Sequence, residues 1–184
     1  MTATAVKVRK ASMRDIPRIL ALINSYAADG VMLPRTEFEM SENIRDFSCA
    51  YDGESLLGCA ALHFYTPQSA EVRSLAVWPA AKQHGVGRAL VEALEIEASD
   101  NGLESIFAFT YVPGFFGKLG FSEVERGELP LKVWKDCLRC SKFENCDEIA
   151  VVKYLRHPAA QQIRSTRRHP GELISLPTLA RLPR

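Results

Sequence analysis

A loop near the middle of the chain has the residue types and spacing of a phosphate-binding site. It follows a strand-like run and consists of Lys82-Gln83-His84-Gly85-Val86-Gly87-Arg88. The two glycines let the backbone approach a bulky ligand closely, and the amides at the start of the helix that follows favour an anion. The loop therefore predicts either a pyrophosphate site or a plain turn at the entry to a helix, and the flanking runs described below favour the first. It matches neither a P-loop, which ends in Gly-Lys-Ser/Thr, nor a Rossmann turn, which has three spaced glycines after the first strand.

A second group with ligand-binding chemistry is a Cys-x2-Cys-x5-Cys pattern made of Cys137, Cys140 and Cys146. Three thiols in a polar loop are candidate zinc ligands, with a nearby aspartate, a histidine or another subunit as the fourth ligand. Two alternatives stay open, a redox-sensitive disulfide and a reduced loop without a ligand. The other two cysteines, Cys49 and Cys59, lie in strand patterns, where we expect them to pack as small apolar side chains.

Periodic patterns along the chain predict the elements that position these loops. Alternating or continuous apolar runs predict strands, and apolar residues three and four apart predict helices. Their order is βααβββαβαββ, with helices that begin near residues 16, 36, 86 and 113 and strands near 6–9, 47–51, 56–64, 71–78, 105–111, 120–124 and 149–152. This order predicts a single α/β (α+β) domain in which helices flank a mixed, mostly antiparallel sheet.

Short local signals mark where several of these elements begin. Ser12 with Asp15, and Thr36 three residues before a glutamate, resemble the capping boxes that start helices. The apolar pattern after Thr36 predicts a helix that extends to Phe47. Asp52-Gly53 between two strand patterns predicts a hairpin turn.

The composition is that of an ordinary globular protein, with 184 residues, 47% hydrophobic and 24% charged. The formal net charge of +1 argues against a globally basic nucleic-acid-binding protein. No apolar run approaches the roughly 20 residues of a membrane span. The first residues have no signal-peptide apolar region, and the five cysteines are an odd number. These features predict a cytoplasmic protein with reduced thiols.

The net charge is the sum of two unlike parts. Residues 156–184 contain six arginines and one acid, a charge of +5, so residues 1–155 carry −4. The tail also has four prolines and no sustained apolar period. We expect one folded domain over residues 1–155 and a flexible, basic extension over 156–184, with a specific binding arm as the alternative.

Residues 6–155 resemble the GNAT superfamily of acetyl-CoA-dependent N-acetyltransferases. The loop resembles the family pattern Arg/Gln-x-x-Gly-x-Gly/Ala, and it lies between a Leu-Ala-Val-x-Pro run at 75–79 and a Phe-Gly-Lys-Leu-Gly-Phe run at 116–121. The resemblance implies acetyl-CoA as cosubstrate and a sheet whose strands near 71–78 and 105–111 separate to admit it. It also implies the cofactor-binding residues Leu75, Ala76, Val77, Lys82, Gln83, His84, Gly85, Val86, Gly87, Arg88 and Phe116.

Shorter segments are similar to the acetyltransferase domain of N-acetylglutamate synthases. They are residues 32–36, 58–62, 71–79, 127–130 and 135–136. Those synthases make N-acetylglutamate from acetyl-CoA and glutamate in the first committed step of arginine biosynthesis. The chain has no amino-acid-kinase domain before this region, so it resembles a short, stand-alone form.

The resemblance also implies which residues are catalytic. Acetyl transfer requires a neutral amine, and Glu71 corresponds to the family glutamate that takes the proton of the ammonium, directly or through a water. Many family members have a tyrosine acid where this chain has Phe116. Thr110, which corresponds to a serine of the synthases, and the adjacent Tyr111 are therefore the candidates for protonating the leaving thiolate.

Recognition of glutamate needs cations for its two carboxylates. The resemblance implies Arg35, in the loop between the first two helices, and His63, at a position where lysine is common. Arg73 lies two residues beyond Glu71 and should share its strand face. The long synthases also have an arginine near the start of the last strand, whereas residues 145–148 contain none. Either Arg73 compensates or the acceptor is another amine.

Together these features predict an enzyme that transfers acetyl from acetyl-CoA to the α-amine of L-glutamate by direct attack. The alternatives are the same chemistry on another amino acid, an amine or a protein N-terminus, and an acetyl-CoA-binding regulator without turnover. The expected partner is a small-molecule amine, with no nucleic acid and no membrane. A homodimer stays an open alternative, because members of this superfamily often form dimers.

Overall fold

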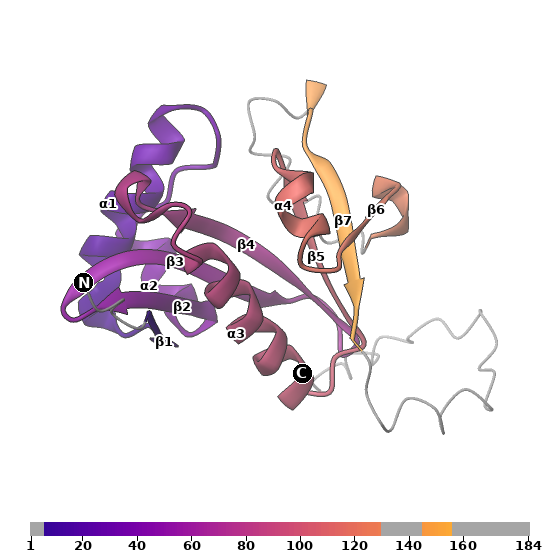
Figure 1. Ribbon diagram of the computed structural model, residues 1–184, viewed down its shortest axis with the longest axis horizontal. Coiled ribbons are helices and arrows are strands. Elements are labelled where there is room, and N and C mark those ends of the chain that lie inside the picture. Colours follow the sequence, from indigo (N-terminus) through magenta and orange to yellow (C-terminus); the bar gives the residue numbers. More distant parts are fainter. Residues whose placement is uncertain (1–5, 130–144, 156–184) are drawn as a thin grey trace, which may run out of the picture.

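The structure is a computed structural model that describes residues 6–129 and 145–155. Its strands form one sheet in the order β1-β2-β3-β4-β5-β7-β6 (Figure 1). They are β1 (Lys7–Lys10), β2 (Phe47–Asp52), β3 (Ser55–Phe64), β4 (Ser69–Val77), β5 (Ser105–Thr110), β6 (Ser122–Val124) and β7 (Ile149–Tyr154). Neighbouring strands are antiparallel except β4 and β5, which are parallel. The predicted mixed, mostly antiparallel sheet is confirmed.

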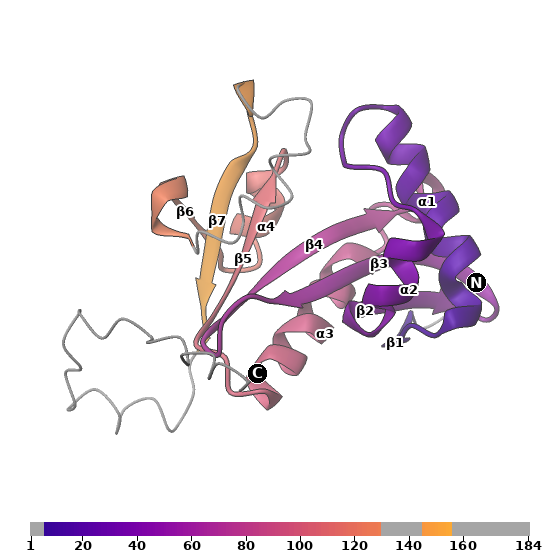
Figure 2. The same ribbon diagram turned by 180° about the vertical axis from the view of Figure 1, so that it is seen from behind.

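Helices cover both faces of this sheet (Figures 1 and 2). Helices α1 (Ile16–Ala28) and α2 (Glu37–Asn43) lie on one face, and α3 (Val86–Asp100) packs along the other. The short helix α4 (Pro113–Gly117) connects β5 to β6. No helix within the described residues has the length and apolar character needed to cross a bilayer.

Capping interactions explain where the first helices begin. The Thr36 hydroxyl accepts from the amide of Glu39 at 3.2 Å, and the Glu39 carboxylate accepts from the amide of Thr36 at 3.0 Å. Ser12 and Asp15 form the second predicted capping box, although a 3-10 turn separates it from α1. The prediction that the second helix reaches Phe47 is wrong. α2 ends at Asn43 and a 3-10 turn follows, because Phe47 is already the first residue of β2.

The two cysteines predicted to pack in strands belong to the core beneath α1. Cys49 and Cys59 face each other across β2 and β3, and neither has exposed surface. Burial raises the pKa of the Cys49 thiol to about 12 and that of the Cys59 thiol well above its usual value. Both thiols are free, so the prediction that they pack as small apolar side chains is confirmed.

The sheet forks between β4 and β5. Their ladder joins only residues 69–71 to residues 105–107, after which the two strands diverge (Figure 1). β7 pairs with the whole of β5 and continues the sheet on the far side of the fork. The gap opens toward the end of β4 from which the 82–88 loop follows. The predicted separation of these two strands is confirmed.

A bulge in β4 changes which side chains face each helical layer. Between the pairs Cys59–Ala76 and Ala61–Arg73, β4 has one residue more than β3. Ser74 lies in this stretch with a φ of 52°, which non-glycine residues seldom adopt. Because the alternation of side chains shifts by one residue, Arg73 and Ala76 face the same side of the sheet although they are three residues apart.

A buried carboxylate connects β1 to the first turn of the chain before α1. The oxygens of Asp15 accept from the Arg9 guanidinium at 2.9 and 3.0 Å, and the Tyr51 hydroxyl donates from β2 at 2.6 Å. The amide and hydroxyl of Ser12 donate as well. These donors, chiefly Arg9, hold the pKa of Asp15 well below its usual range. We call Arg9, Asp15 and Tyr51 the Asp15 cluster.

Candidate active site

The loop predicted to bind phosphate presents backbone amides at the open end of the fork. Gln83 and Gly85 have positive φ values of 67° and 77°, and Gly85 directly precedes α3. Residues 82–85 are exposed, whereas the Val86 side chain is 1% exposed and belongs to the core. The loop and the fifteen-residue helix behind it therefore provide oriented N–H groups, which suit a bound anion.

Three basic side chains surround this loop and remain exposed. The Lys82 ammonium lies 5.1 Å from the centre of the Tyr26 ring. His84 places Nδ1 2.8 Å from the carbonyl oxygen of Lys82. Arg88 forms a 3.4 Å ion pair with Glu92 along α3. The side chains of Lys82, His84 and Arg88, three of the predicted cofactor-binding residues, thus lie at the loop surface.

The second glycine of the loop and Phe116 have packing roles. A Cβ on Gly87 would lie 3.3 Å from the Phe115 ring, so glycine lets α4 approach the start of α3. Phe116 is 3% exposed, and its ring packs edge-on between Phe115 and Phe121. Phe116 therefore packs in the core between α3 and α4. Its contact with a cofactor stays a prediction.

The predicted cofactor strand Leu75–Val77 borders the open part of the fork. Ala76 is 3% exposed, and Leu75 and Val77 are half-buried against the core on the α3 side. The Tyr26 hydroxyl of α1 donates to the carbonyl of Val77 at 2.5 Å. Because β4 has no ladder to β5 beyond Glu71, its backbone on this side faces the gap.

A polar cluster surrounds the predicted base, Glu71, at the closed end of the fork, where β4 and β5 are still paired. The Tyr65 hydroxyl donates to Glu71 Oε2 at 3.0 Å, and Arg73 Nη1 lies 3.9 Å from the same oxygen. Arg73 also donates to the Tyr65 hydroxyl oxygen at 3.5 Å. The side chains of Glu71 and Arg73 are 12% and 13% exposed. The prediction that these two residues share a strand face is confirmed, and we call the three residues the Glu71 cluster.

His63 lies directly across from Glu71 and has a carboxylate partner of its own. The two residues are a cross-strand pair between β3 and β4. His63 Nδ1 lies 2.6 Å from Asp46 Oδ2, in the turn before β2. The His63 side chain is 30% exposed. The structure therefore places an aspartate–histidine pair next to the Glu71 cluster.

Arg35 lies in the loop between α1 and α2, and its backbone is held by one side chain. Asn24 of α1 accepts from the amide of Arg35 at 2.9 Å and donates to its carbonyl at 3.0 Å. This double hydrogen bond fixes the loop on the face of the sheet that carries Glu71. Arg35 itself is half-buried.

The candidates for protonating the thiolate lie at the other end of β5. Thr110 is the last residue of that strand and is 6% exposed, and its hydroxyl oxygen accepts from the amide of Val112 at 3.0 Å. Tyr111 follows it and is 36% exposed. Thr110 lies about 10 Å along β5 from the residue that pairs with Glu71. The structure thus separates the predicted base from the predicted acids.

The proposed zinc ligands are only partly described. Cys137 and Cys140 lie outside the described residues, whereas Cys146 is a free thiol whose Sγ lies 3.8 Å from Glu148 Oε2. Within the described residues there is no group of three or more side chains suited to hold a metal ion. An arginine nonetheless reaches the start of the last strand, because Arg126 donates to the carbonyls of Cys146 and Glu148.

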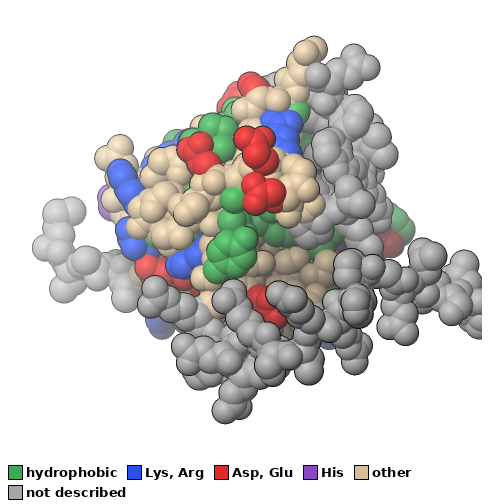
Figure 3. All heavy atoms as spheres, turned by 90° about the vertical axis from the view of Figure 1, so that its right-hand side faces the viewer, with side chains coloured by type: hydrophobic (Ala, Val, Ile, Leu, Met, Phe, Trp, Pro, Cys, Tyr) green, Lys and Arg blue, Asp and Glu red, His purple; other side chains and the backbone are tan. Residues whose placement is uncertain are grey.

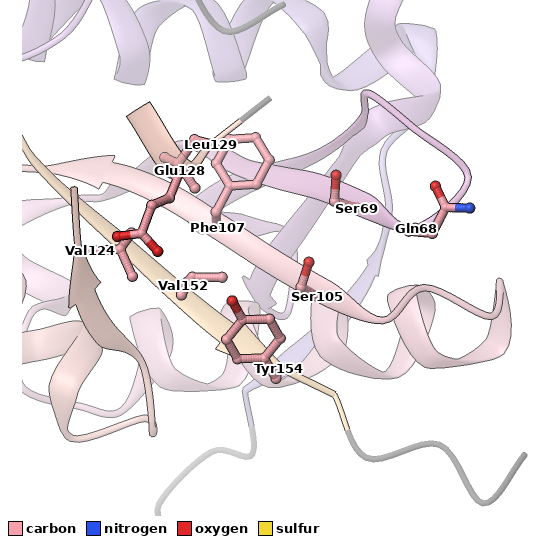
Figure 4. Close-up of a pocket in the computed structure, with 9 residues that line it drawn as sticks. All are labelled: Gln68, Ser69, Ser105, Phe107, Val124, Glu128, Leu129, Val152 and Tyr154. Atoms are coloured by element: carbon pink, nitrogen blue, oxygen red, sulfur yellow. The ribbon is translucent and has the colours of Figure 1, made fainter. Parts of the chain in front are cut away.

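A pocket of about 220 Å³ lies below the closed end of the fork (Figure 4). Its side chains come from the beginnings of β4 and β5, the end of β7 and the turn after β6, and they include Ser69, Ser105, Phe107, Val152 and Glu128. The described lining contains no arginine or lysine.

The nearby surface is acidic. Figure 3 shows acidic side chains gathered on the side of the molecule that carries β6. Glu123, Glu125 and Glu128 are exposed in β6 and the turn that follows it.

Three residues of the site were not predicted from the sequence. Tyr65, Asp46 and Asn24 each contact a predicted residue, namely Glu71, His63 and Arg35. Tyr65 was within reach of a sequence argument, because it precedes Glu71 by six residues, in the short connection between the strands predicted at 56–64 and 71–78. No local signal marks Asp46 or Asn24, since both act across separate elements.

The forked sheet and the glycine-containing loop at 82–88 are accompanied by a family match that gives the class of protein. Residues 18–121 match the acetyltransferase (GNAT) family, and the chain belongs to this family. It is an acetyl-CoA-dependent N-acetyltransferase. It is 42% identical to an uncharacterized N-acetyltransferase of Chlorobaculum tepidum over 156 residues, which are 84% of this chain and all of that protein. It is 32% identical to an amino-acid acetyltransferase of Mycobacterium tuberculosis over 135 residues, 72% of this chain and 77% of that protein.

Solved structures show the same fold. The N-acetylglutamate synthase from Neisseria gonorrhoeae, complexed with coenzyme A and N-acetyl-glutamate, matches with a TM-score of 0.77 and 29% identity. The match covers 83% of this chain and 36% of that chain. A Mycobacterium tuberculosis protein in complex with CoA matches with a TM-score of 0.69 and 27% identity, over 82% of this chain and 99% of that chain.

The residues present fit acetyl-CoA as the cosubstrate. The exposed amides around Gln83 and Gly85 suit a pyrophosphate, and the gap beyond Glu71 leaves β4 backbone groups available to an extended arm. A Cβ on Gly85 would meet open space, but its φ of 77° disfavours other residues there. Acetyl-CoA supplies the activated acetyl group.

Proposed function

We propose that this enzyme transfers the acetyl group of acetyl-CoA to the α-amine of L-glutamate by direct attack, the first step of arginine biosynthesis. The observation that carries the proposal is the Glu71 cluster at the closed end of the fork, where a carboxylate and a guanidinium lie side by side. Relatives named amino-acid acetyltransferase, and the N-acetylglutamate synthase with the same fold, support an amino acid as the acceptor.

Glu71 takes the proton from the incoming ammonium, directly or through one water, so that the neutral amine attacks the acetyl carbon. The amide of Leu75 or Ala76 stabilises the oxyanion that forms. Thr110 or Tyr111 protonates the departing thiolate. An ordinary thiol pKa of about 8.5 makes this leaving group a fairly good one without full protonation.

Arg35 and Arg73 bind the two carboxylates of glutamate in this proposal, and His63 adds a third polar contact. A guanidinium forms a bidentate pair with a carboxylate, which provides orientation as well as attraction. Arg35 is presented by the loop that Asn24 holds in place. Arg73 lies beside Glu71, so it would bring a carboxylate close to the group that accepts the proton.

The second candidate function is acetylation of a different amine, such as another amino acid, a polyamine or a protein N-terminus. Two of the side chains assigned to the acceptor lie beside carboxylates of the protein. Arg73 faces Glu71, and His63 pairs with Asp46. The adjoining pocket adds Glu128. This local negative charge favours an acceptor that carries fewer carboxylates than glutamate.

The deciding experiment measures CoA release from acetyl-CoA across a panel of amino acids, polyamines and peptide N-termini. The proposal expects L-glutamate to have the highest kcat/KM. Turnover with another amine and none with glutamate would overturn the glutamate assignment in favour of the second candidate. Binding of acetyl-CoA without turnover on any acceptor would instead support a regulator.

We also propose that residues 1–155 contain the whole catalytic unit, that 156–184 form an extension, and that the enzyme works in the cytoplasm on a small-molecule amine. Activity of a chain that ends at Leu155, equal to that of the full chain, is the expected result. A loss of kcat on this truncation would assign the extension a part in the reaction.

A further inference from the structure

Glu71 lies in a set of side chains that restrict its orientation. Tyr65 donates to Glu71 Oε2 at 3.0 Å from the turn between β3 and β4, and Arg73 lies 3.9 Å from the same oxygen. His63, paired with Asp46, stands directly across on β3. Since the Glu71 side chain is only 12% exposed, protein groups rather than bulk water set much of its environment.

Tyr65 is itself held firmly from two sides. Its ring meets His63 edge-on with centroids 5.0 Å apart and packs against Phe107 of β5 at 5.8 Å. Its amide donates to the carbonyl of Ser69 at 3.1 Å, and the Thr66 hydroxyl accepts from the amide of Ser69 at 3.0 Å to close the turn. With its backbone and ring both fixed, the hydroxyl has little freedom to leave Glu71.

We propose that Tyr65 is a positioning residue for acetyl transfer, whose hydroxyl orients the Glu71 carboxylate and stabilises its ionised form for taking the acceptor's proton. This inference rests on the proposed function, because it requires Glu71 to be the base. A hydrogen bond from an O–H group to a carboxylate is strong when it is shielded from water. Tyr65 also accepts from Arg73 at 3.5 Å, so one hydroxyl connects the guanidinium to the carboxylate.

The groups that face Glu71 have opposite effects on the ionisation of its carboxyl group. Arg73 on β4 and Tyr65 in the turn favour the carboxylate, Asp46 opposes it through like charge, and His63 favours it when protonated. The facing residue on β5 is Phe107, which contributes no charge. Loss of the Tyr65 hydroxyl removes one donor to Glu71 and the acceptor that it offers to Arg73, while every charged group is retained, which makes the contribution of the hydroxyl measurable.

The test compares Tyr65→Phe with the unchanged full chain, using whichever amine the acceptor panel identifies. Phenylalanine keeps the ring packing on His63 and Phe107 and removes only the hydroxyl. We expect the acidic limb of the kcat/KM pH profile to move about half a unit to one unit higher, since a carboxylate that loses a donor ionises at higher pH. At neutral pH, kcat should fall about three- to tenfold, with KM for acetyl-CoA unchanged.

The matched control is Tyr51→Phe, which removes a tyrosine hydroxyl from a carboxylate outside the site, that of Asp15. It should lower Tm and leave the pH profile in place. A Tyr65→Phe profile identical to that of the unchanged protein, while Glu71→Gln is inactive, would overturn the role of Tyr65 alone. Full activity of Glu71→Gln would overturn the proposed base and the inference with it. An equal shift of the limb in both tyrosine variants would also refute the inference.

Discussion

Two groups in this protein contain the same three residue types, a carboxylate, an arginine and a tyrosine, and they differ in geometry. In the Asp15 cluster the guanidinium contacts both carboxylate oxygens at 2.9 and 3.0 Å, and the tyrosine hydroxyl lies at 2.6 Å. In the Glu71 cluster the corresponding distances are 3.9 Å for the arginine and 3.0 Å for the tyrosine.

The difference follows from where each cluster lies in the fold. Asp15 accepts from β1, from β2 and from its own capping turn, so its charge joins three elements. Glu71 is the last residue of the short β4–β5 ladder, where the sheet begins to open. A carboxylate that a guanidinium contacts through both oxygens is a weak base, whereas one whose guanidinium neighbour lies 3.9 Å away is held less strongly in its ionised form by that neighbour. The comparison favours a structural role for Asp15 and supports the proposal that Glu71 is the base.

The largest effect should come from Glu71→Gln, which removes the proton acceptor and keeps the shape of the side chain. We expect kcat to fall about 10²- to 10³-fold at neutral pH, because general base catalysis contributes on this scale. Tm should change little, since the glutamine can still accept from Tyr65. Steady-state kinetics and thermal melting on the same preparation measure the fall in kcat and the unchanged Tm. Full activity of Glu71→Gln would contradict the proposed difference between the two clusters.

The converse variant is Asp15→Asn, for which we expect a loss of stability with little change in kcat. Arg9 and Tyr51 would lose a charged acceptor that is 4% exposed. Because Arg9 is half-exposed and stays hydrated, we expect a cost of about 2 kcal/mol, which lowers Tm by about 4–8 °C. Urea unfolding measures the change, and an unaltered midpoint would show that the Asp15 cluster adds no stability.

A smaller effect is expected on the binding of the acceptor when Arg35 is replaced. Arg35→Ala should raise KM for glutamate about tenfold or more, with kcat and KM for acetyl-CoA nearly unchanged. Asn24→Ala, which releases the Arg35 loop, should raise the same KM by less. Arg18→Ala is the matched control, because Arg18 is an arginine of α1 that contacts only the carbonyl of Glu54 among the interactions described for it. Equal kinetics for all three variants would remove Arg35 from the acceptor site.

The smallest effect concerns acid stability. The pKa of Asp15 is lowered in the folded state, so its contribution to stability is fully present above the unfolded pKa of about 3.9. It is lost as the pH falls from about 5 toward the folded pKa. We expect a decrease on the order of 1 kcal/mol between pH 6 and pH 3 that Asp15→Asn lacks. Denaturant unfolding at both pH values measures it, and parallel pH curves for the two proteins would contradict it.

The sequence predicted most of the fold, because its signals there are local. The strands, the Asp52-Gly53 turn and the Thr36 capping box all depend on residues within a few positions of one another. The helix after Thr36 was predicted too long because apolar periodicity continues through Phe47, although tertiary pairing places that residue in β2. The fork was expected from the family resemblance and not from the pattern of residues.

The sequence by itself determined the order of the elements, the glycine-containing loop before α3 and the shared face of Glu71 and Arg73. These depend on the alternation of side chains along a strand and on glycines at a helix start. Only the tertiary structure decided that Tyr65 and His63 flank Glu71, that Asp46 pairs with His63, and that Asn24 holds the Arg35 loop. Such contacts join separate elements, and hydrogen-bond distances between them exist only after the sheet and helices have packed together.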